Sequence, residues 1–241
     1  MKKILSIALG MLAFISPMKA QNDATVNKEV SKDAPTVIKV EPQLDDIYEV
    51  LKALNINMYR FDLSKYLNEI YDVKLYVDEY EDGKRIKEAG SSRLGKNIKS
   101  LKELPEEMRD DFRKIKNVPE GKDEWDNIKE MSVYITKPND STAMFTINIP
   151  GVLKTNKRVQ LRPVGEEKMY LYDPRPFKFN PASETESINI PLVMYGSYWF
   201  DARYNVIRMC GEREIDPEMK AEILGKVPHY YVVGLELNKV K

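Results

Sequence analysis

The chain has 241 residues, of which 42% are apolar and 32% charged, and its mean hydropathy is −0.49. This composition is typical of a soluble globular protein and excludes a collagen-like chain, a disulfide-dense mini-protein and a polytopic membrane protein. Lys plus Arg and Asp plus Glu each number 38, and because neither charge dominates we expect no nucleic-acid partner.

Residues 1–20 have the three parts of a secretory signal peptide. Lys2 and Lys3 give a positive start, Ile4 to Ser16 is an uncharged stretch of 13 residues, and Ala20 precedes the expected cleavage site. The stretch is shorter than the roughly 20 residues that a membrane-spanning helix needs. We therefore expect an exported protein, periplasmic, outer-surface or extracellular, with no transmembrane segment in the mature chain. The alternative is an uncleaved interfacial anchor.

Residues 21–42 contain no aromatic side chain and little periodicity, which predicts a flexible leader. Apolar residues then recur at helical spacing, at Leu44, Ile47, Leu51 and Leu54, and predict a helix with one buried stripe. From Tyr71 the pattern changes to alternation, typical of a strand with one buried face, and Asp82-Gly83 predicts a hairpin turn.

Two further helices are expected, at Leu104 to Ile115 and at Asp216 to Leu224, and a short helical turn at Asp123 to Lys129. From Met131 the chain reads mostly as strands, one of them running from Ile188 to Asp201. The predicted fold class is therefore α+β, a mostly antiparallel β-sheet with three or so packing helices. We expect a single α+β domain over residues 43–241, with two lobes that meet near 118–130 as the alternative.

The sequence contains no catalytic signature. Cys210 is the only cysteine and His229 the only histidine, so a disulfide within the chain and the usual zinc sites are excluded. There is no glycine-rich phosphate loop and no serine-hydrolase elbow. We therefore expect no cofactor and no metal, and the catalytic residues, if any, stay unknown. We interpret His229 as a structural residue and Cys210 as a small buried hydrophobe.

Acidic residues cluster at the predicted hairpin, at Asp78, Glu79, Glu81 and Asp82. Their spacing fails the calcium-binding loop, because the twelfth position counted from Asp78 is Ala89. We interpret the cluster as a solvated hairpin end.

Aromatic residues gather between Tyr195 and Tyr204. On one continuous strand Tyr195 and Trp199 share a face, and such a face could stack against a sugar ring or a partner protein. These two residues are the candidate ligand-binding residues. A central strand buried on both faces would show the same composition, and burial of this kind is the more frequent case.

The Lys-Lys start, the strand-rich body and the segment IPLVMYGSYWFDARYNVIRMCGE (Ile190 to Glu212) resemble secreted Bacteroides proteins grouped as a domain of unknown function. The resemblance implies a periplasmic or surface location and transfers no site. In such organisms Asp140-Ser141-Thr142 also resembles the short O-glycosylation triplet of exported proteins.

The function expected from the sequence is an exported, non-enzymatic binding or accessory domain of the cell envelope. Its partner would be a glycan, a peptide or an envelope protein. One alternative is a carboxylate-dependent, glycosidase-like hydrolase, because acidic residues are plentiful. Another is a structural envelope protein without a small ligand. A cleft with two facing acids would favour the hydrolase, and a shallow aromatic patch would favour binding.

Overall fold

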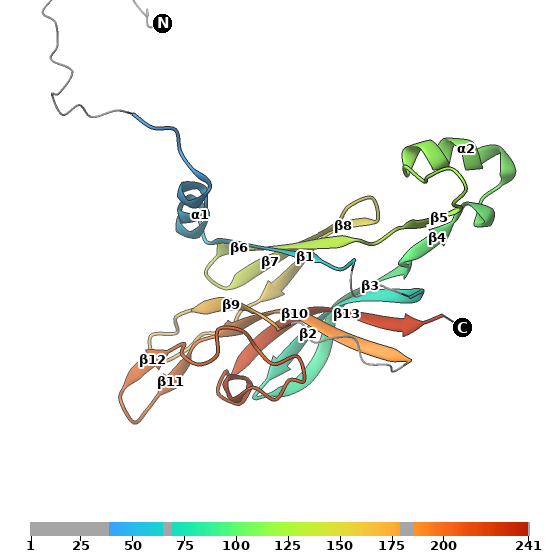
Figure 1. The fold of residues 1–241 in the computed structure, drawn as a ribbon. Coiled ribbons are helices and arrows are strands. Elements are labelled where there is room, and N and C mark those ends of the chain that lie inside the picture. Colours follow the sequence, from blue (N-terminus) through green and yellow to red (C-terminus); the bar gives the residue numbers. More distant parts are fainter. Residues whose placement is uncertain (1–38, 65–68, 179–185, 241) are drawn as a thin grey trace, which may run out of the picture. The chain divides into compact units, whose positions relative to one another are not determined.

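The computed structural model describes residues 39–64, 69–178 and 186–240 (Figure 1). The chain divides into two units, Met1–Glu41 and Pro42–Lys241, and all elements described here belong to the second. The expected signal peptide at 1–20 and most of the expected leader at 21–42 lie outside the described residues. Within the described ranges, no helix has both the length and the apolar character needed to cross a membrane.

Two antiparallel sheets form the body of the second unit (Figure 1). The first sheet has the strand order β1 (Ile56–Asp62), β6 (Glu130–Asn139), β7 (Thr142–Ile149) and β8 (Leu153–Gln160). The second has the order β3 (Lys84–Lys96), β2 (Tyr71–Glu81), β13 (His229–Lys239), β10 (Ser187–Ser197) and β9 (Tyr172–Pro176). Two short ribbons pair β4 (Ile98–Ser100) with β5 (Glu124–Asp126), and β11 (Trp199–Asp201) with β12 (Val206–Arg208).

The main core lies between these two sheets. Alternate side chains of a strand point to opposite faces, and one buried cluster includes Val133, Phe145 and Val159 of the first sheet together with Leu75 and Leu235 of the second. The fully buried Phe145 ring meets the rings of Tyr195 and Tyr231 edge-on, with centroids 5.9 and 6.0 Å apart. The fold is thus a β-sandwich whose inner faces are joined by aromatic contacts.

A second buried cluster covers the outer face of the second sheet. Met194 of β10 and Val232 of β13 pack there against Ile215, Leu224 and Val227, which come from the segment between β12 and β13. Strands β10 and β13 are therefore buried on both faces, which explains why their sequences read as nearly continuous apolar runs.

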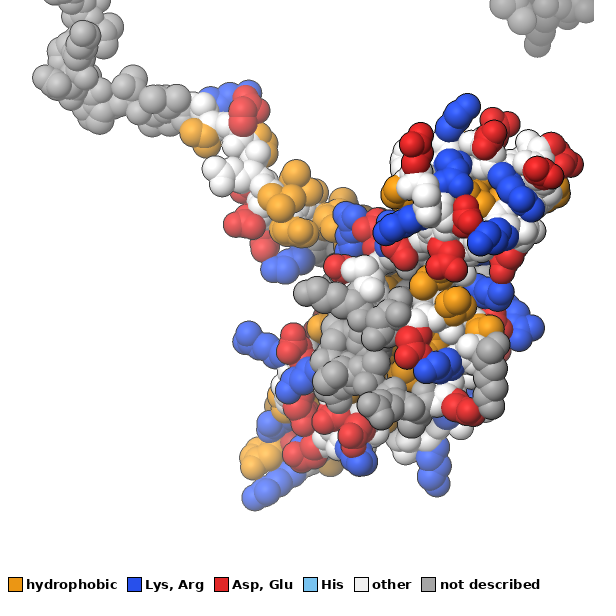
Figure 2. All heavy atoms as spheres, turned by 45° about the vertical axis from the view of Figure 1, so that its right-hand side comes forward, with side chains coloured by type: hydrophobic (Ala, Val, Ile, Leu, Met, Phe, Trp, Pro, Cys, Tyr) orange, Lys and Arg blue, Asp and Glu red, His pale blue; other side chains and the backbone are white. Residues whose placement is uncertain are grey.

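The expectation of an α+β domain with three or so packing helices is wrong, and the fold is β-rich. Among the described residues the only α-helices are α1 (Leu44–Ala53) and α2 (Glu106–Ile115), beside two short 3-10 helices, Leu101–Glu103 and Glu222–Gly225. Neither α-helix contains a buried side chain: Leu44 is 62% exposed and Ile115 68% exposed. Charged side chains of both signs cover the α2 region in Figure 2. The apolar stripes predicted the two helices correctly but not their packing.

The helix predicted at Asp216–Leu224 is mostly replaced by turns. The Asp216 carboxylate accepts a hydrogen bond from the backbone N–H of Glu218 at 2.8 Å, and Met219 has a φ of +59°, which a right-handed helix does not allow. Only Glu222–Gly225 forms a short 3-10 helix, where Ile223 and Leu224 enter the second cluster. The helical turn predicted at Asp123–Lys129 is also wrong, because residues 124–126 pair with β4 as strand β5.

Candidate functional site

A pocket of about 410 Å³ lies where the edge strands β1 and β9 of the two sheets approach each other. It is lined by residues from the end of α1, β1, β6, β9 and β10 and the segment before β9. These residues are Lys52, Asn55, Asn57, Lys137, Tyr170, Leu171, Tyr172, Asp173, Tyr195 and Tyr198. We call it the tyrosine pocket.

Four of the lining residues are tyrosines. The rings of Tyr172 and Tyr195 lie 5.3 Å apart at an angle of 34°. Tyr195 belongs to the core and is 4% exposed, whereas Tyr198 is only partly buried. Burial raises the pKa of Tyr198, so its phenol is neutral at physiological pH. Tyr198 therefore presents a neutral aromatic surface to the pocket.

Asp173 is the one carboxylate among the described lining residues. The protein around it desolvates the carboxyl group and raises its pKa, with Arg175 acting in the opposite direction. A glycosidase of the usual kind needs two carboxyl groups about 5 to 10 Å apart across the sugar. The lining supplies one such group with two asparagines and two lysines, a set suited to hydrogen bonding with ligand hydroxyls.

A chain of hydrogen bonds through the buried side chains of His229 and Glu79 fixes the hydroxyl group of Tyr172. Its hydroxyl lies 2.6 Å from Nδ1 of His229, whose Nε2 lies 3.0 Å from Oε1 of Glu79. Lys87 Nζ lies 2.9 Å from the other oxygen of Glu79. Because a carboxylate only accepts, Nε2 of a neutral His229 donates to Glu79 and Nδ1 accepts from Tyr172. We call Glu79, His229 and Tyr172 the polar chain.

The polar chain positions the Tyr172 ring but does not expose its hydroxyl. The hydroxyl oxygen also accepts the backbone N–H of Arg162 at 2.9 Å. Neither Arg162 nor His229 lines the tyrosine pocket. The hydroxyl is thus held on the side of His229, and the ring forms part of the pocket wall. This arrangement suits a fixed binding surface better than a reacting tyrosine.

Burial sets the charge states of the polar chain. His229 is 2% exposed, and this burial lowers its pKa although the neighbouring Glu79 acts in the opposite direction. Burial alone would raise the pKa of Glu79, but hydrogen bonds from His229 and Lys87 outweigh it and lower the pKa. Near neutral pH the polar chain therefore contains a neutral imidazole and a carboxylate.

These shifts predict that acid destabilises the protein. An unfolded histidine binds a proton below about pH 6.5, whereas folded His229 does so only at lower pH, so the unfolded state binds more protons and stability falls as pH falls. Urea unfolding at several pH values between about 7 and 5 should show this loss. His229 is the only histidine, so the non-titrating variant His229→Gln should flatten the curve in this range. An unchanged slope in the variant would contradict the assignment.

The structure separates the two predicted ligand-binding residues. Tyr195 lines the tyrosine pocket, but Trp199 does not. Strand β10 ends at Ser197, and Trp199 begins β11 and packs against the second cluster, on the other side of the sheet from Tyr195. The expected shared face on one strand from Ile188 to Asp201 is therefore wrong, because the strand is interrupted at Tyr198.

The interpretation of the acidic cluster as a solvated hairpin end is wrong for two of its four residues. Asp78 is 6% exposed and Glu79 is 4% exposed, so these two carboxylates are not solvated. Arg85 pairs with Asp78 at 2.6 Å on one face, and the polar chain holds Glu79 on the other. The sequence contains a signal for the burial of Glu79 that the prediction did not use. Glu79 follows Val73, Leu75 and Val77 at two-residue steps, so it lies on the inner face of β2 with them.

The prediction for Cys210 is wrong as well: this residue, expected to be buried, is exposed.

Tyr170, Tyr172, Asp173 and Asn57 were not predicted as site residues, because no local motif marks them. Within the described residues, no group of three His, Cys, Asp or Glu side chains is placed to hold a metal ion.

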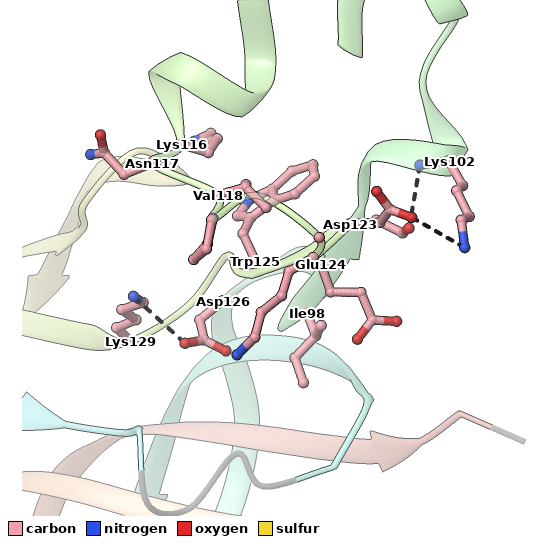
Figure 3. Close-up of a pocket in the computed structure, with 14 residues that line it drawn as sticks. Ile98, Lys102, Lys116, Asn117, Val118, Asp123, Glu124, Trp125, Asp126 and Lys129 are labelled. Atoms are coloured by element: carbon pink, nitrogen blue, oxygen red, sulfur yellow. Dashed lines mark hydrogen bonds and ion pairs between the residues drawn. The ribbon is translucent and has the colours of Figure 1, made fainter. Parts of the chain in front are cut away.

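A second pocket of about 810 Å³ lies in the segment from β4 to β5, and we call it the tryptophan pocket (Figure 3). Trp125 and Val118 line it together with charged side chains of both signs. Lys102 and Arg113 pair with Asp123 at 3.2 and 3.1 Å. The hydrogen bond from Lys102 lowers the pKa of Asp123, so this carboxyl is no proton donor near neutral pH. We take the tyrosine pocket as the candidate site because four of its lining residues are tyrosines, whereas Trp125 is the one aromatic residue among the described residues that line the tryptophan pocket.

Residues 27–239 match a family described as a domain of unknown function (DUF5041). No curated protein and no solved structure matches the chain. The part of the resemblance that named a domain of unknown function is confirmed.

Proposed function

This chain belongs to the DUF5041 family, whose description names no activity, and we propose from the geometry of its site that it is a non-enzymatic binding protein whose tyrosine pocket takes a carbohydrate. The observation that carries the proposal is the lining of the pocket, four tyrosines with one carboxylate, two asparagines and two lysines.

This lining matches the two kinds of surface on a sugar. The C–H groups of a pyranose ring form an apolar face that packs on an aromatic ring, while its hydroxyls hydrogen-bond to carboxylate, amide and ammonium groups. The volume of about 410 Å³ is in the range of small-molecule sites, roughly 300 to 1,000 Å³. The polar chain fixes Tyr172 before the ligand arrives, which lowers the entropic cost of binding.

Sugar binding should depend on Tyr198. The variant Tyr198→Ala removes a partly buried ring from the pocket, and we expect a roughly tenfold loss of affinity, since one aromatic contact contributes about 1 kcal/mol beyond its buried area. Isothermal titration calorimetry with cellohexaose, maltohexaose and mannohexaose gives the measurement. The control is Tyr204→Ala, an exposed tyrosine outside the pocket, and it should bind as the wild type does.

The same titrations can overturn the proposal. If none of the three oligosaccharides binds, or if Tyr198→Ala binds as tightly as the wild type, the tyrosine pocket is not their site. Binding of a tyrosine-free peptide library at this pocket, with no sugar bound, would assign a peptide ligand instead. Chromatography of the sugars after incubation tests the hydrolase alternative, and cleaved products that disappear in Asp173→Asn would replace the binding proposal.

Export to the cell envelope is part of the proposal and is supported by residues 1–20 alone. A ligand site for glycans suits a protein at the cell surface or in the periplasm. The first residue of the exported chain is then Gln21, which mass spectrometry of the secreted protein would show.

A further inference from the structure

A third pocket, of about 290 Å³, lies at the opposite open edge of the sandwich from the tyrosine pocket. Strands β8 and β3 end the two sheets on this side and contact each other. The pocket between them is lined by the cations Lys87, Lys157 and Arg158 and by the carboxylates Glu79 and Glu88. We call it the β3–β8 pocket.

Both carboxylates of the β3–β8 pocket already have partners. Glu79 is held by His229 at 3.0 Å and by Lys87 at 2.9 Å. Glu88 pairs with Lys74 at 2.8 Å and accepts a hydrogen bond from Ser91. Neither acid pairs with Lys157 or Arg158. Other groups therefore balance the two carboxylates, and Lys157 has no carboxylate partner in the pocket.

Lys157 is built into the pocket rather than extended into solvent. On β8 it points to the same side as the buried Val159, toward the interior, and it is partly buried. Its methylene groups lie on the backbone of Gly90 in β3: a Cβ atom added at Gly90 would be 3.2 Å from Cδ and 3.3 Å from Cε of Lys157. The side-chain stem of Lys157 therefore lies next to the space that a side chain at residue 90 would occupy.

The ammonium group of Lys157 has no counter-charge of its own. Neither Lys157 nor Arg158 forms an ion pair with any residue that the structure describes. A partly buried ammonium loses hydration and gains from an anion placed beside it. Arg158, the next residue of β8, is exposed and belongs to the opposite face of the strand, so Lys157 is the cation that faces the pocket without a partner.

We propose that the β3–β8 pocket binds an oxyanion group, with Lys157 as its cation. The group is of the chemistry of sulfate, phosphate or carboxylate, free or carried by a larger ligand. The site is separate from the tyrosine pocket, and its test uses inorganic ions without sugar. The result of this test therefore does not depend on whether the tyrosine pocket binds a carbohydrate.

The test measures thermal unfolding in increasing phosphate, sulfate or acetate, with potassium chloride added to hold the ionic strength constant. We expect at least one of the three ions to raise the melting temperature of the wild type saturably, by on the order of 3 °C at about ten times its Kd. The variant Lys157→Met keeps the apolar stem and loses the charge, so the shift should disappear. The matched control is Lys154→Met, an exposed lysine on the same strand, and it should keep the shift.

The three arms also identify the chemistry, because a shift with acetate alone points to carboxylates, and a shift with sulfate or phosphate points to tetrahedral oxyanions. Calorimetric titration of the same ion into the wild type and Lys157→Met should give binding only to the wild type. An equal shift in both lysine variants, a shift that rises without saturation, or no shift with any ion would overturn the proposal.

Discussion

Gly234→Ala should destabilise the protein by about 3 kcal/mol, because no atom larger than hydrogen fits at this position. Gly234 lies in the central strand β13, opposite Tyr76 of β2 and next to β10. An added Cβ would lie 2.6 Å from the backbone oxygen of Ile190 and would overlap the phenol of Tyr76. The backbone oxygen cannot move without breaking the pairing of β10 with β13, so the strain falls on the centre of the sheet.

The loss should be seen as a fall in melting temperature of roughly 6 to 12 °C, and as an equal loss in the free energy of unfolding in urea. Gly225→Ala is the control. A Cβ added at Gly225 meets no atom within 4 Å, and its effect should stay within about 0.5 kcal/mol. Similar stability of the two alanine variants would contradict the close approach of Tyr76 to β13.

Glu79→Ala should cost about 3 kcal/mol or more, because it removes one partner of a buried charged network. The substitution leaves the Nε2–H of buried His229 without its acceptor and removes the ion-pair partner of Lys87. An unsatisfied buried donor costs more than an ordinary hydrogen bond contributes. The free energy of unfolding in urea at pH 7 gives the measurement.

The control is Glu81→Ala, two residues further along the same strand. Glu81 is 43% exposed and pairs with Arg162 at 3.4 Å, so its loss should cost at most about 1 kcal/mol. Glu79→Gln keeps an acceptor for His229 without the charge and should lie between the two alanine variants. If Glu79→Ala and Glu81→Ala lowered the free energy of unfolding by the same amount, water would be replacing Glu79 as the partner of His229. That result would contradict the burial of the polar chain.

Local patterns predicted the local structure well. The alternation from Tyr71 and the Asp82-Gly83 turn gave the β2–β3 hairpin, where both turn residues have the positive φ that such a turn needs, +48° and +74°. The stripe from Leu44 gave α1. The same stripe could not show that α1 stays exposed, because periodicity reports that a helix is amphipathic and not what it packs against.

The site could not be predicted because its residues meet only through the sheet order. Tyr172 and His229 are 57 residues apart, and Glu79 and His229 are 150 apart. In the tyrosine pocket Asn57 of β1 lies with Asp173 of β9, which is in the other sheet. Tyr195 was found because the aromatic residues around it form a local cluster. The interior position of Glu79 in the alternation of β2 was available as a signal and was misread as hairpin solvation.

The position of β13 determines when the chain can fold. Among the described strands β13 is the last in chain order, yet it pairs with β2 and β10 in the middle of the second sheet and contributes side chains to both buried clusters. Until it emerges, β2 with β3 and β10 with β9 are two unconnected pairs, and neither cluster is complete. Completion of the second sheet therefore waits until β13 has left the ribosome and depends on long-range pairing, which is slow. A growing chain therefore lacks both complete cores for as long as β13 is still inside the ribosome.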